Sequence, residues 1–358
     1  MPRVFALVLN YNAADHLPRV IESLRHQDFQ NLGILIVDNA STDGSVEVLH
    51  RLLSPEEVMF CTENTGYGGG FNAGLRQLSS RSDYIMLMNP DMVPASNWAS
   101  RAVAHLDANP RTDMISGLTL TDDGETIECM GGSVYSFPLG LMGGYLGTRR
   151  SAECAIELAV ASVSTIFVLG NPMMIRSASL ARSGMFDESY FMYFEDIDLS
   201  WRTLLAGGNI EALPSLVCRH KGHASKRSRE LDYRIARAPE TNLLLTYHKI
   251  LNSRHFWGWL PFLLLTRGLL ALTYLAIDPR LTTSKLAGLS EGLHRIICDP
   301  HQREWRRKVQ STRIREDHFL FERNRRVRYL SVGSTWTIAS SWFRNMFRTF
   351  GRRRPSMR

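Results

Sequence analysis

Residues 4–12 read VFALVLNYN, a run of six apolar residues that stops at three polar ones. Comparable runs, mainly apolar and continuous rather than alternating, recur at residues 33–38, 58–61 and 84–88. Such continuity is typical of strands buried on both faces of a parallel sheet. Helical patterns separate the runs, at residues 13–26, 45–53 and 71–78. The sequence therefore predicts an α/β fold in which helices flank a Rossmann-like, mostly parallel sheet.

The composition fits a folded protein of more than one part. The chain has 358 residues, of which 44% are hydrophobic, and this excludes a disordered protein. Residues 1–248 hold 20 Lys and Arg against 28 Asp and Glu, whereas residues 249–358 hold 22 against 7. We expect two domains, residues 1–230 and residues 231–358, and an anionic partner for the second.

The second part carries two candidate membrane segments. Residues 256–277 are almost wholly apolar and long enough to span a bilayer, but Arg267 and Pro261 interrupt them. We therefore expect this segment to lie in or on one leaflet. Aromatic residues recur every three to four positions over residues 336–350, interleaved with arginines, which predicts an amphipathic helix for an anionic membrane surface. Packing of that helix on its own domain is the alternative; nucleic acid is not expected, because no nucleic-acid module accompanies the arginines.

The cysteines and the start of the chain indicate the compartment. Five widely separated cysteines, with no C-x-x-C pair, favour a reducing environment: Cys61, Cys129, Cys154, Cys218 and Cys298. The apolar run at residues 4–9 is too short for a signal peptide. We therefore expect the first half of the chain to lie in the cytosol.

Two nucleotide-binding classes are excluded by motif. A dinucleotide-binding dehydrogenase needs glycines directly after the first strand, where this chain has Asn10-Tyr11-Asn12. The glycines at residues 66–70 come after the third strand and miss the G-x-G-x-x-G spacing. No G-x-x-x-x-G-K-[ST] loop occurs either, which argues against a P-loop nucleotidase.

Amides and acids lie after the predicted strands instead, at the edge where an open sheet of this kind binds ligands. Asp38 could accept the imide N–H of a uracil or thymine ring, and Asn10 and Asn12 could bind base or ribose. Asp91, two residues after Asn89, offers the carboxylate that a hard divalent cation prefers. A further loop could let a nucleotide approach closely through bare backbone, with these candidate residues: Asn64, Gly66 and Asn72.

A second acidic group occupies residues 193–202, YFEDIDLSWR. Three carboxylates within four positions repel one another unless a cation, a base role or hydrogen bonds hold them. Asp198 can pair with Arg202 one helical turn later, which leaves Asp196 as the candidate for chemistry, with Glu195 beside it. His220 comes directly after an apolar run, so it is a candidate cation ligand at a strand end.

Together these motifs resemble the family 2 glycosyltransferases of the GT-A fold, most closely the rhamnosyltransferase-like branch. The resemblance covers residues 3–228 and rests on six segments in order: LNYN (9–12), VDNASTDGS (37–45), NTGYGGGFNAG (64–74), NPD (89–91), GMFDE with YFEDID (184–188 and 193–198) and HKG (220–222). The family's metal motif is often Asp-x-Asp, whereas its first position here is Asn89.

The resemblance implies an inverting sugar transferase. Asp196 would be the general base, supported by the neighbouring Glu195, Asp198 and Arg202, while Asp91 and His220 would hold Mg²⁺ or Mn²⁺ against the donor diphosphate. The implied donor is dTDP-L-rhamnose and the implied acceptor a polyprenyl-diphosphate-linked glycan of the cell envelope. The enzyme would act as a peripheral protein at the cytoplasmic face of the inner membrane.

The sequence leaves three alternatives open. A UDP-sugar could replace the dTDP-sugar. A sugar nucleotidyltransferase would use a related sheet, but it should show a Gly-rich, basic loop after the first strand, where this chain has none. A non-catalytic membrane scaffold would keep the fold, although Asp91, Asp196 and His220 are all in place. The sequence does not predict an oligomeric state.

Overall fold

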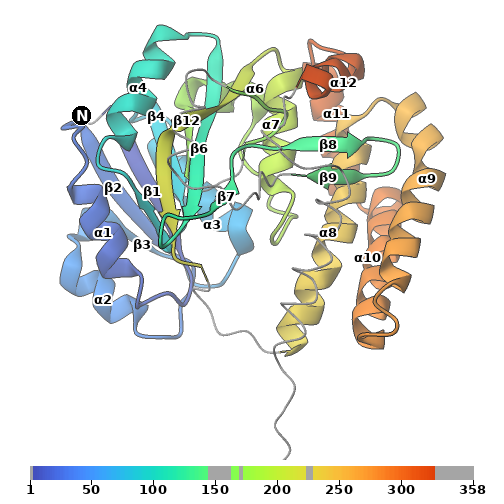
Figure 1. The fold of residues 1–358 in the computed structure, drawn as a ribbon, viewed down its shortest axis with the longest axis horizontal. Helices are drawn as coiled ribbons and strands as arrows, with labels where there is room; N and C mark the ends of the chain where they lie inside the picture. Colours follow the sequence, from blue (N-terminus) through green and yellow to red (C-terminus); the bar gives the residue numbers. More distant parts are fainter. Residues whose placement is uncertain (1–2, 144–162, 169–171, 223–228, 327–358) are drawn as a thin grey trace, which may run out of the picture. The chain divides into compact units, whose positions relative to one another are not determined.

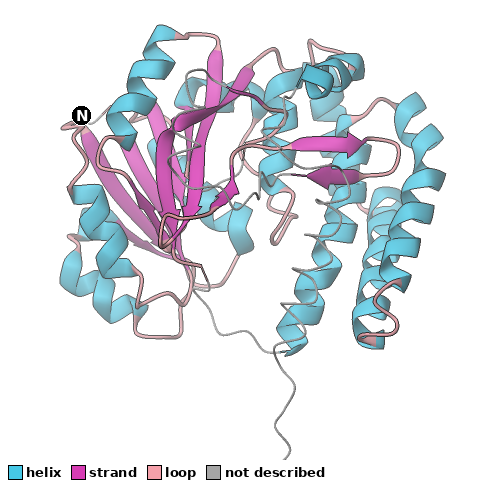
Figure 2. Cartoon of the chain, viewed as in Figure 1, coloured by secondary structure: helices cyan, strands magenta, loops and turns pink. Residues whose placement is uncertain are grey.

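The structure is a computed structural model that describes residues 3–143, 163–168, 172–222 and 229–326. Within these residues a ten-stranded mixed sheet forms the framework, in the order β10-β12-β6-β11-β4-β1-β2-β3, with β5 paired to β12 and β7 to β6. Figures 1 and 2 show helices covering both faces of this sheet.

The first four strands of the framework are parallel, as predicted. They are β1 (Val4–Asn10), β2 (Leu32–Asp38), β3 (Val58–Phe60) and β4 (Tyr84–Met88). β1 pairs with β2 on one side and with β4 on the other, so the carboxyl ends of three strands meet at one edge. Their side chains are buried almost without interruption, which explains the continuous apolar runs.

The other half of the sheet departs from the sequence prediction. It contains β5 (Met92–Pro94), β6 (Thr112–Thr121), β7 (Ile127–Cys129), β10 (Val163–Ser164), β11 (Met173–Arg176) and β12 (Asn209–His220). β11 is antiparallel to both β4 and β6. The mainly apolar sequence of residues 166–175 predicts one strand, and this prediction is wrong, because β11 begins only at Met173. A separate ladder joins β8 (Ser133–Ser136) and β9 (Leu141–Gly143).

Helices from the first 205 residues form the two covering layers. One apolar core lies under α1 (Leu17–Arg25), α2 (Ser45–Leu52) and α4 (Trp98–Ala108), and the other under α3 (Gly66–Leu78) and α7 (Glu195–Leu205). Short helical turns occur at η1 (Pro55–Glu57), η2 (Ser177–Ser179) and α6 (Leu180–Ser183).

The glycine-rich segment before residue 71 is helix, which corrects the predicted loop. α3 begins at Gly66, and its glycines are buried. A Cβ at Gly70 would overlap the side chain of Leu9 on β1, and one at Gly74 would overlap Leu7. The glycines therefore let α3 lie close against the sheet rather than leave backbone bare for a ligand.

Five helices complete the described chain: α8 (Arg229–Ile250), α9 (Ser253–Leu272), α10 (Pro279–Cys298), α11 (Pro300–Thr312) and α12 (Asp317–Arg326). Side-chain caps begin three of them, from Asn252, Asp278 and Asp299. Residues of α8 to α12 share the apolar core under α7, so both sides of the boundary expected at residue 230 contribute to it. The helix predicted at residues 336–350 lies outside the described residues.

A buried ionic cluster joins these helices to the sheet layer. Lys249 on α8 is fully buried, and its Nζ lies 2.6 Å from Asp187 Oδ2 and 2.9 Å from Asp198 Oδ1 on α7. Arg202 Nη2 lies 2.7 Å from Asp198 Oδ2, and His301 Nε2 on α11 lies 3.1 Å from Asp187 Oδ1. Every carboxylate oxygen of this cluster thus faces a donor, which is what a buried charge requires.

The cluster also holds Asp187 in the charged form. Burial by itself would raise the pKa of Asp187, but the charge of Lys249 and the hydrogen bonds from His301 and Lys249 hold it well below its usual value. The Asp187 carboxylate is therefore ionised at any ordinary pH, and the charge of Lys249 stabilises this ionised form.

Replacing Lys249 with Met should reduce the free energy of unfolding by about 3–5 kcal/mol, because two buried carboxylates lose a shared cation. Urea denaturation of the full chain measures this change. The matched control, Arg307→Met at an exposed position of α11, should change it by no more than about 0.5 kcal/mol. A loss below about 1 kcal/mol for Lys249→Met would contradict the role assigned to the cluster.

Candidate active site

Three predicted site residues lie at the carboxyl edge of the parallel strands. Asn10 ends β1, Asp38 ends β2, and Asp91 comes after β4 and a two-residue turn. Because β1 lies between β2 and β4, Asp38 and Asp91 are about two strand spacings apart, roughly 10 Å. This edge could accommodate an extended ligand with different groups at its two ends.

Asp38 and Asn10 form a buried pair at one end of the edge. Asp38 Oδ1 accepts from Asn10 Nδ2 at 2.7 Å, and Asp38 Oδ2 accepts from the Ser41 backbone at 3.0 Å. Asn10 Oδ1 is buried, and no described residue donates to it. Asn12, with a positive φ of 50°, accepts at Oδ1 from the Thr42 backbone at 2.7 Å. These residues shape the turns, and the acceptor Oδ1 of Asn10 remains available.

Asn39 organises the turn that precedes α3. Its Nδ2 donates to Asn64 Oδ1 and to the Gly66 carbonyl, each at 3.0 Å, while its Oδ1 accepts from the Thr65 backbone at 3.1 Å. Gly66 has a φ of +75°, and a Cβ there would overlap the Phe191 backbone. Asn64 and Gly66 therefore fix this turn against the loop that carries Phe191.

Asn72, further along α3, likewise forms hydrogen bonds that fix a neighbouring loop. Its Oδ1 accepts from the Phe186 backbone at 3.0 Å, and its Nδ2 donates to the Phe186 carbonyl and to Glu188 Oε1, each at 2.9 Å. The side chain is buried. The geometry thus makes Asn72 a support of residues 186–188, while donor binding by this residue stays a prediction.

Asp91 and His220 lie together at the other end of the edge. His220 Nε2 lies 3.1 Å from Asp91 Oδ2, and its Nδ1 lies 2.6 Å from Glu128 Oε2 on β7. The hydrogen bonds to Asp91 and Glu128 outweigh burial and raise the pKa of His220 to about 10. Asp91 Oδ1 is buried and accepts no hydrogen bond from any described residue. The half-buried Asn89 begins the same turn.

This arrangement fits a divalent cation only in part. An unpartnered carboxylate oxygen such as Asp91 Oδ1 is a suitable ligand for Mg²⁺ or Mn²⁺. Across the described residues, however, no three His, Cys, Asp or Glu side chains converge as a metal-binding group. A cation held here would therefore take most of its ligands from a bound diphosphate and water.

The acidic motif on α7 faces the same region. Burial raises the pKa of the Tyr67 phenol at the start of α3, and the charges of Glu195, Asp196 and Asp91 raise it further. Burial, then the charges of Glu128 and Asp196, likewise raise the pKa of Cys129 to about 11, against a hydrogen bond from Thr119. Such effects require proximity, so the two acidic groups that are far apart in sequence lie near one another.

Glu195 and Asp196 differ in environment. Glu195 is buried, its Oε2 has no hydrogen-bond partner among the described residues, and burial followed by the charge of Asp196 raises its pKa well above the usual value. Asp196 is half-buried in the first turn of α7, where its Oδ1 accepts from the Ile197 backbone at 2.8 Å. Asp196 is thus the more accessible member of the pair, while burial favours the protonated form of Glu195.

The backbone before α7 is strained. Tyr193 and Phe194 have φ values of 70° and 72°, a left-handed conformation that costs a non-glycine residue on the order of 1–3 kcal/mol. Asn242 on α8 holds this turn, donating to the carbonyls of Met192 and Tyr193 at 3.0 and 2.9 Å. On the other side the Tyr67 backbone donates to the Phe191 carbonyl at 2.7 Å.

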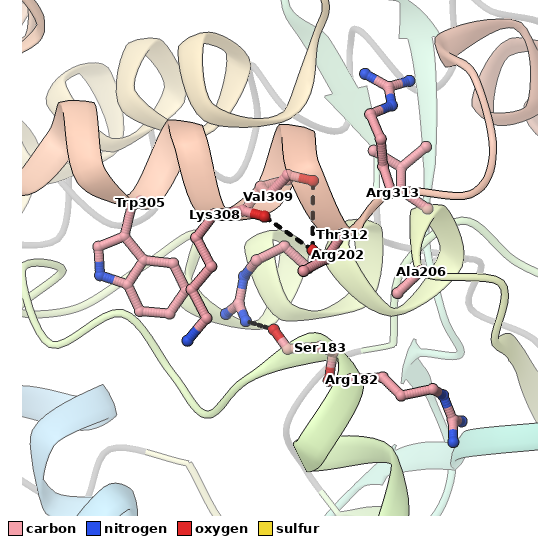
Figure 3. Close-up of a pocket in the computed structure, with 10 residues that line it drawn as sticks. Arg182, Ser183, Arg202, Ala206, Trp305, Lys308, Val309, Thr312 and Arg313 are labelled. Atoms are coloured by element: carbon pink, nitrogen blue, oxygen red, sulfur yellow. Dashed lines mark hydrogen bonds between the residues drawn. The ribbon is translucent and has the colours of Figure 1, made fainter.

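Asp198 and Arg202 form the pair that their spacing predicts and belong to the buried cluster around Lys249. Arg202 also donates to the carbonyls of Ser183 and Met185. Figure 3 shows Arg202 close to Trp305 and Lys308 of α11 in a cavity of about 10 Å³, which has room for no more than a water molecule. These two residues therefore position α7 rather than bind a substrate.

A larger hollow, of about 790 Å³, lies at the opposite edge of the sheet. It is lined by residues at the amino ends of β1 and β2, among them Phe5 and Gly33, and by Arg81. Because ligands of open parallel sheets bind at the carboxyl edge, the hollow is separate from the candidate site.

Sequence reasoning missed two residues of the site. Glu128 lies on β7, a three-residue strand in a region where the sequence pattern is weak. Tyr67 lies inside the glycine-rich segment, for which the sequence predicts a loop. A helix predicted over residues 66–78 would have placed Tyr67 in the first turn, beside the strand ends.

Comparisons with known proteins agree with this geometry. Residues 6–142 match the family model described as Glycosyl transferase family 2. The chain is 28% identical over 322 residues to N-acetylglucosaminyl-diphospho-decaprenol L-rhamnosyltransferase of Mycobacterium tuberculosis H37Rv, an alignment that covers 80% of this chain and 98% of that protein. It is 23% identical over 235 residues to the rhamnosyltransferase WbbL of Escherichia coli K12, covering 63% and 86%.

Solved structures resemble the fold. GalNAc-T7 with UDP, GalNAc and Mn²⁺ superposes with a TM-score of 0.56 at 10% identity, covering 83% of this chain and 56% of that one. Staphylococcus aureus TarS 1–349 in complex with UDP-GlcNAc gives 0.51 at 15% identity, covering 87% and 89%. With the motif-bearing strand ends, the match of residues 6–142 to this family model makes the chain similar to the family 2 glycosyltransferases, and its fold is of the GT-A type.

Proposed function

We propose that the enzyme transfers L-rhamnose from dTDP-L-rhamnose, with inversion, to a lipid-linked saccharide in cell-envelope polysaccharide assembly. The observation that carries the proposal is the buried, unpartnered Oδ1 of Asp91 at the carboxyl edge of the sheet, together with the charges of Asp91 and Asp196 that both act on the Tyr67 phenol. Sugar and acceptor are suggested by the similarity to two rhamnosyltransferases, of which one acts on a diphospho-decaprenol-linked sugar.

The donor would lie along the carboxyl edge, with its base at Asp38 and its diphosphate at Asp91. Asp38 accepts two hydrogen bonds from protein, and a carboxylate has about four lone-pair sites, so it can also accept the imide N–H of thymine. Asn10 Oδ1 offers a second acceptor next to it. We assign Asn12, Asn64, Gly66, Asn72 and Asn89 to shaping or lining this donor site.

A Mg²⁺ or Mn²⁺ ion bound with the donor would stabilise the negative charge of the departing diphosphate. Asp91 Oδ1 would contribute one ligand. His220 could contribute Nε2 after losing one proton, with Glu128 keeping the hydrogen bond from Nδ1. A neutral histidine held by a carboxylate in this way is a common metal ligand, and the pairing explains why Glu128 is needed.

Asp196 would act as the general base. It would take the proton from the acceptor hydroxyl as that oxygen forms its bond to the anomeric carbon and the bond to the diphosphate oxygen breaks. Attack from the opposite face inverts the configuration in one displacement. The protonated Glu195 beside it keeps a second negative charge away from the incoming hydroxyl.

The exposed aromatic side chains beside the base suit a saccharide acceptor. Phe191 and Tyr193 are exposed in the strained turn immediately before Glu195. Sugar rings pack their apolar faces on aromatic rings, so this turn is a platform from which a hydroxyl can reach Asp196. We place the enzyme peripherally, at the cytoplasmic face of the membrane that carries the lipid acceptor.

Replacing Asp196 with Asn should lower kcat by about 10²–10⁴-fold, because the amide cannot accept the proton. Donor KM should change little, since Asp196 does not hold the nucleotide. Nucleotide release with a lipid-linked acceptor measures both constants. Asp28→Asn, on the exposed surface, is the matched control and should leave kcat unchanged. Normal turnover by the Asp196→Asn enzyme would contradict the assignment of Asp196 as the base, and absence of turnover in the wild type would favour the non-catalytic scaffold.

Removal of divalent metal should abolish transfer, because the leaving diphosphate loses its counter-charge. EDTA treatment followed by Mn²⁺ or Mg²⁺ addition tests this, with restored activity as the control. Asp91→Asn should weaken metal activation, seen as a higher Mn²⁺ concentration for half-maximal rate. Full activity in EDTA would remove Asp91 and His220 from their proposed roles.

A donor panel separates the two donor classes. Purified enzyme given acceptor should release dTDP from dTDP-L-rhamnose faster than it releases UDP from UDP-sugars. Faster turnover of a UDP-sugar would establish the alternative donor and contradict the rhamnosyl assignment while leaving the transferase chemistry intact.

A further inference from the structure

One side of α9 presents apolar side chains to solvent. Five of them, spaced three to five residues apart, are between 50% and 62% exposed, and we call them the α9 outer face: Trp257, Phe262, Leu265, Leu269 and Leu272. Leu275, in the turn after the helix, is 54% exposed as well. Figure 1 shows α9 at the margin of the helical region, on the side away from the sheet. The surface of a soluble monomeric protein rarely exposes so many large apolar side chains next to one another.

The opposite side of α9 holds the one charge within its apolar stretch. Arg267 donates from Nε and Nη2 to the two carboxylate oxygens of Glu240 on α8, at 2.7 and 2.8 Å, and Lys285 on α10 contacts the same carboxylate at 2.9 Å. At 100° per residue, Arg267 falls within an arc of about 80° together with the buried Phe256, Leu263 and Ala271. The arginine therefore faces protein, and the outer face carries no charge.

Charges bracket the outer face at its ends. Arg254, in the first turn of α9, and Arg280, eight residues after its end, are both exposed. Residues 249–358 hold 22 Lys and Arg against 7 Asp and Glu. No helix of the described residues is long and apolar enough to cross a membrane. An apolar strip with cations at both ends matches the boundary between acyl chains and anionic headgroups.

We propose that the α9 outer face inserts, parallel to the surface, into the headgroup boundary of an anionic bilayer. The inference deepens the proposed function, on which it rests, since a lipid-linked acceptor has to be met at a membrane. A bilayer is favoured over a protein partner because the five apolar side chains lie between exposed arginines, the arrangement that suits acyl chains flanked by anionic headgroups.

The segment of α8 that contacts α9 also contacts the turn before Glu195. Glu240, which holds Arg267 and Lys285, and Asn242, which holds the strained turn before Glu195, are two residues apart on α8. The docking helix and the acceptor turn are therefore fixed by one segment of α8. Docking of α9 would set the height of Phe191 and Tyr193 above the membrane.

Co-sedimentation of the full chain with vesicles of equal parts phosphatidylcholine and phosphatidylglycerol tests the proposal. The double variant Leu265→Gln with Leu269→Gln should weaken partitioning by about tenfold for each leucine, the loss expected when a buried Leu becomes polar. Ile314→Gln, at a residue 77% exposed outside α9, is the matched control and should bind as the wild type does. Equal binding by the double variant, or no binding by the wild type, would overturn the proposal.

Thermal unfolding and turnover of the double variant distinguish membrane docking from a protein-covered face and from a defect in catalysis. The double variant should keep the wild-type thermal midpoint, because its side chains face solvent; a clear fall would mean that protein covers the face, against the proposal. Its release of nucleotide with a water-soluble acceptor should also stay normal. If the wild type binds vesicles through these leucines but turns over no nucleotide-sugar, the proposed function fails and the docking surface stands.

Discussion

The buried ion cluster around Lys249 is the constraint on which the arrangement of this enzyme depends. Lys249 joins Asp187 to Asp198, so a helix from the C-terminal region is tied to the loop and the helix that carry the acidic motif. Burying these charges is costly, and the cost is offset only while every oxygen keeps its donor. Arg202 completes the set. Asp198 belongs to this cluster, and Asp196 lies two residues before it on α7.

The same rigidity supports the strained turn before Asp196. Left-handed backbone at Tyr193 and Phe194 persists only where neighbouring structure holds it, and Asn242 supplies the hydrogen bonds from α8. The C-terminal helices therefore hold the turn that leads to Asp196, the proposed base. The same region of the chain presents the apolar outer face of α9.

The features that local pattern determines could be predicted from the sequence. This group includes the four parallel strands, the acidic helix and the strand-end position of His220. Apolar runs indicate which residues are buried, and the polar residues after them indicate where each strand ends. Glycine's low helix propensity hid the start of α3, where close packing on β1 decides. The partners of Glu128 and Arg267 are remote in sequence, so no local signal could reveal them. The burial of Glu195 next to Asp196 could not be predicted either, because it depends on tertiary packing with residues remote in sequence.

The central claim is that separate strand ends form one donor site with Asp91 at its diphosphate end. A crystal grown with dTDP and Mn²⁺ tests it most directly, through the anomalous signal of the manganese. We predict an anomalous peak in coordination contact with Asp91 Oδ1 and the thymine ring against Asp38. A manganese peak remote from Asp91, or a nucleotide bound in the hollow at the opposite edge of the sheet, would contradict it.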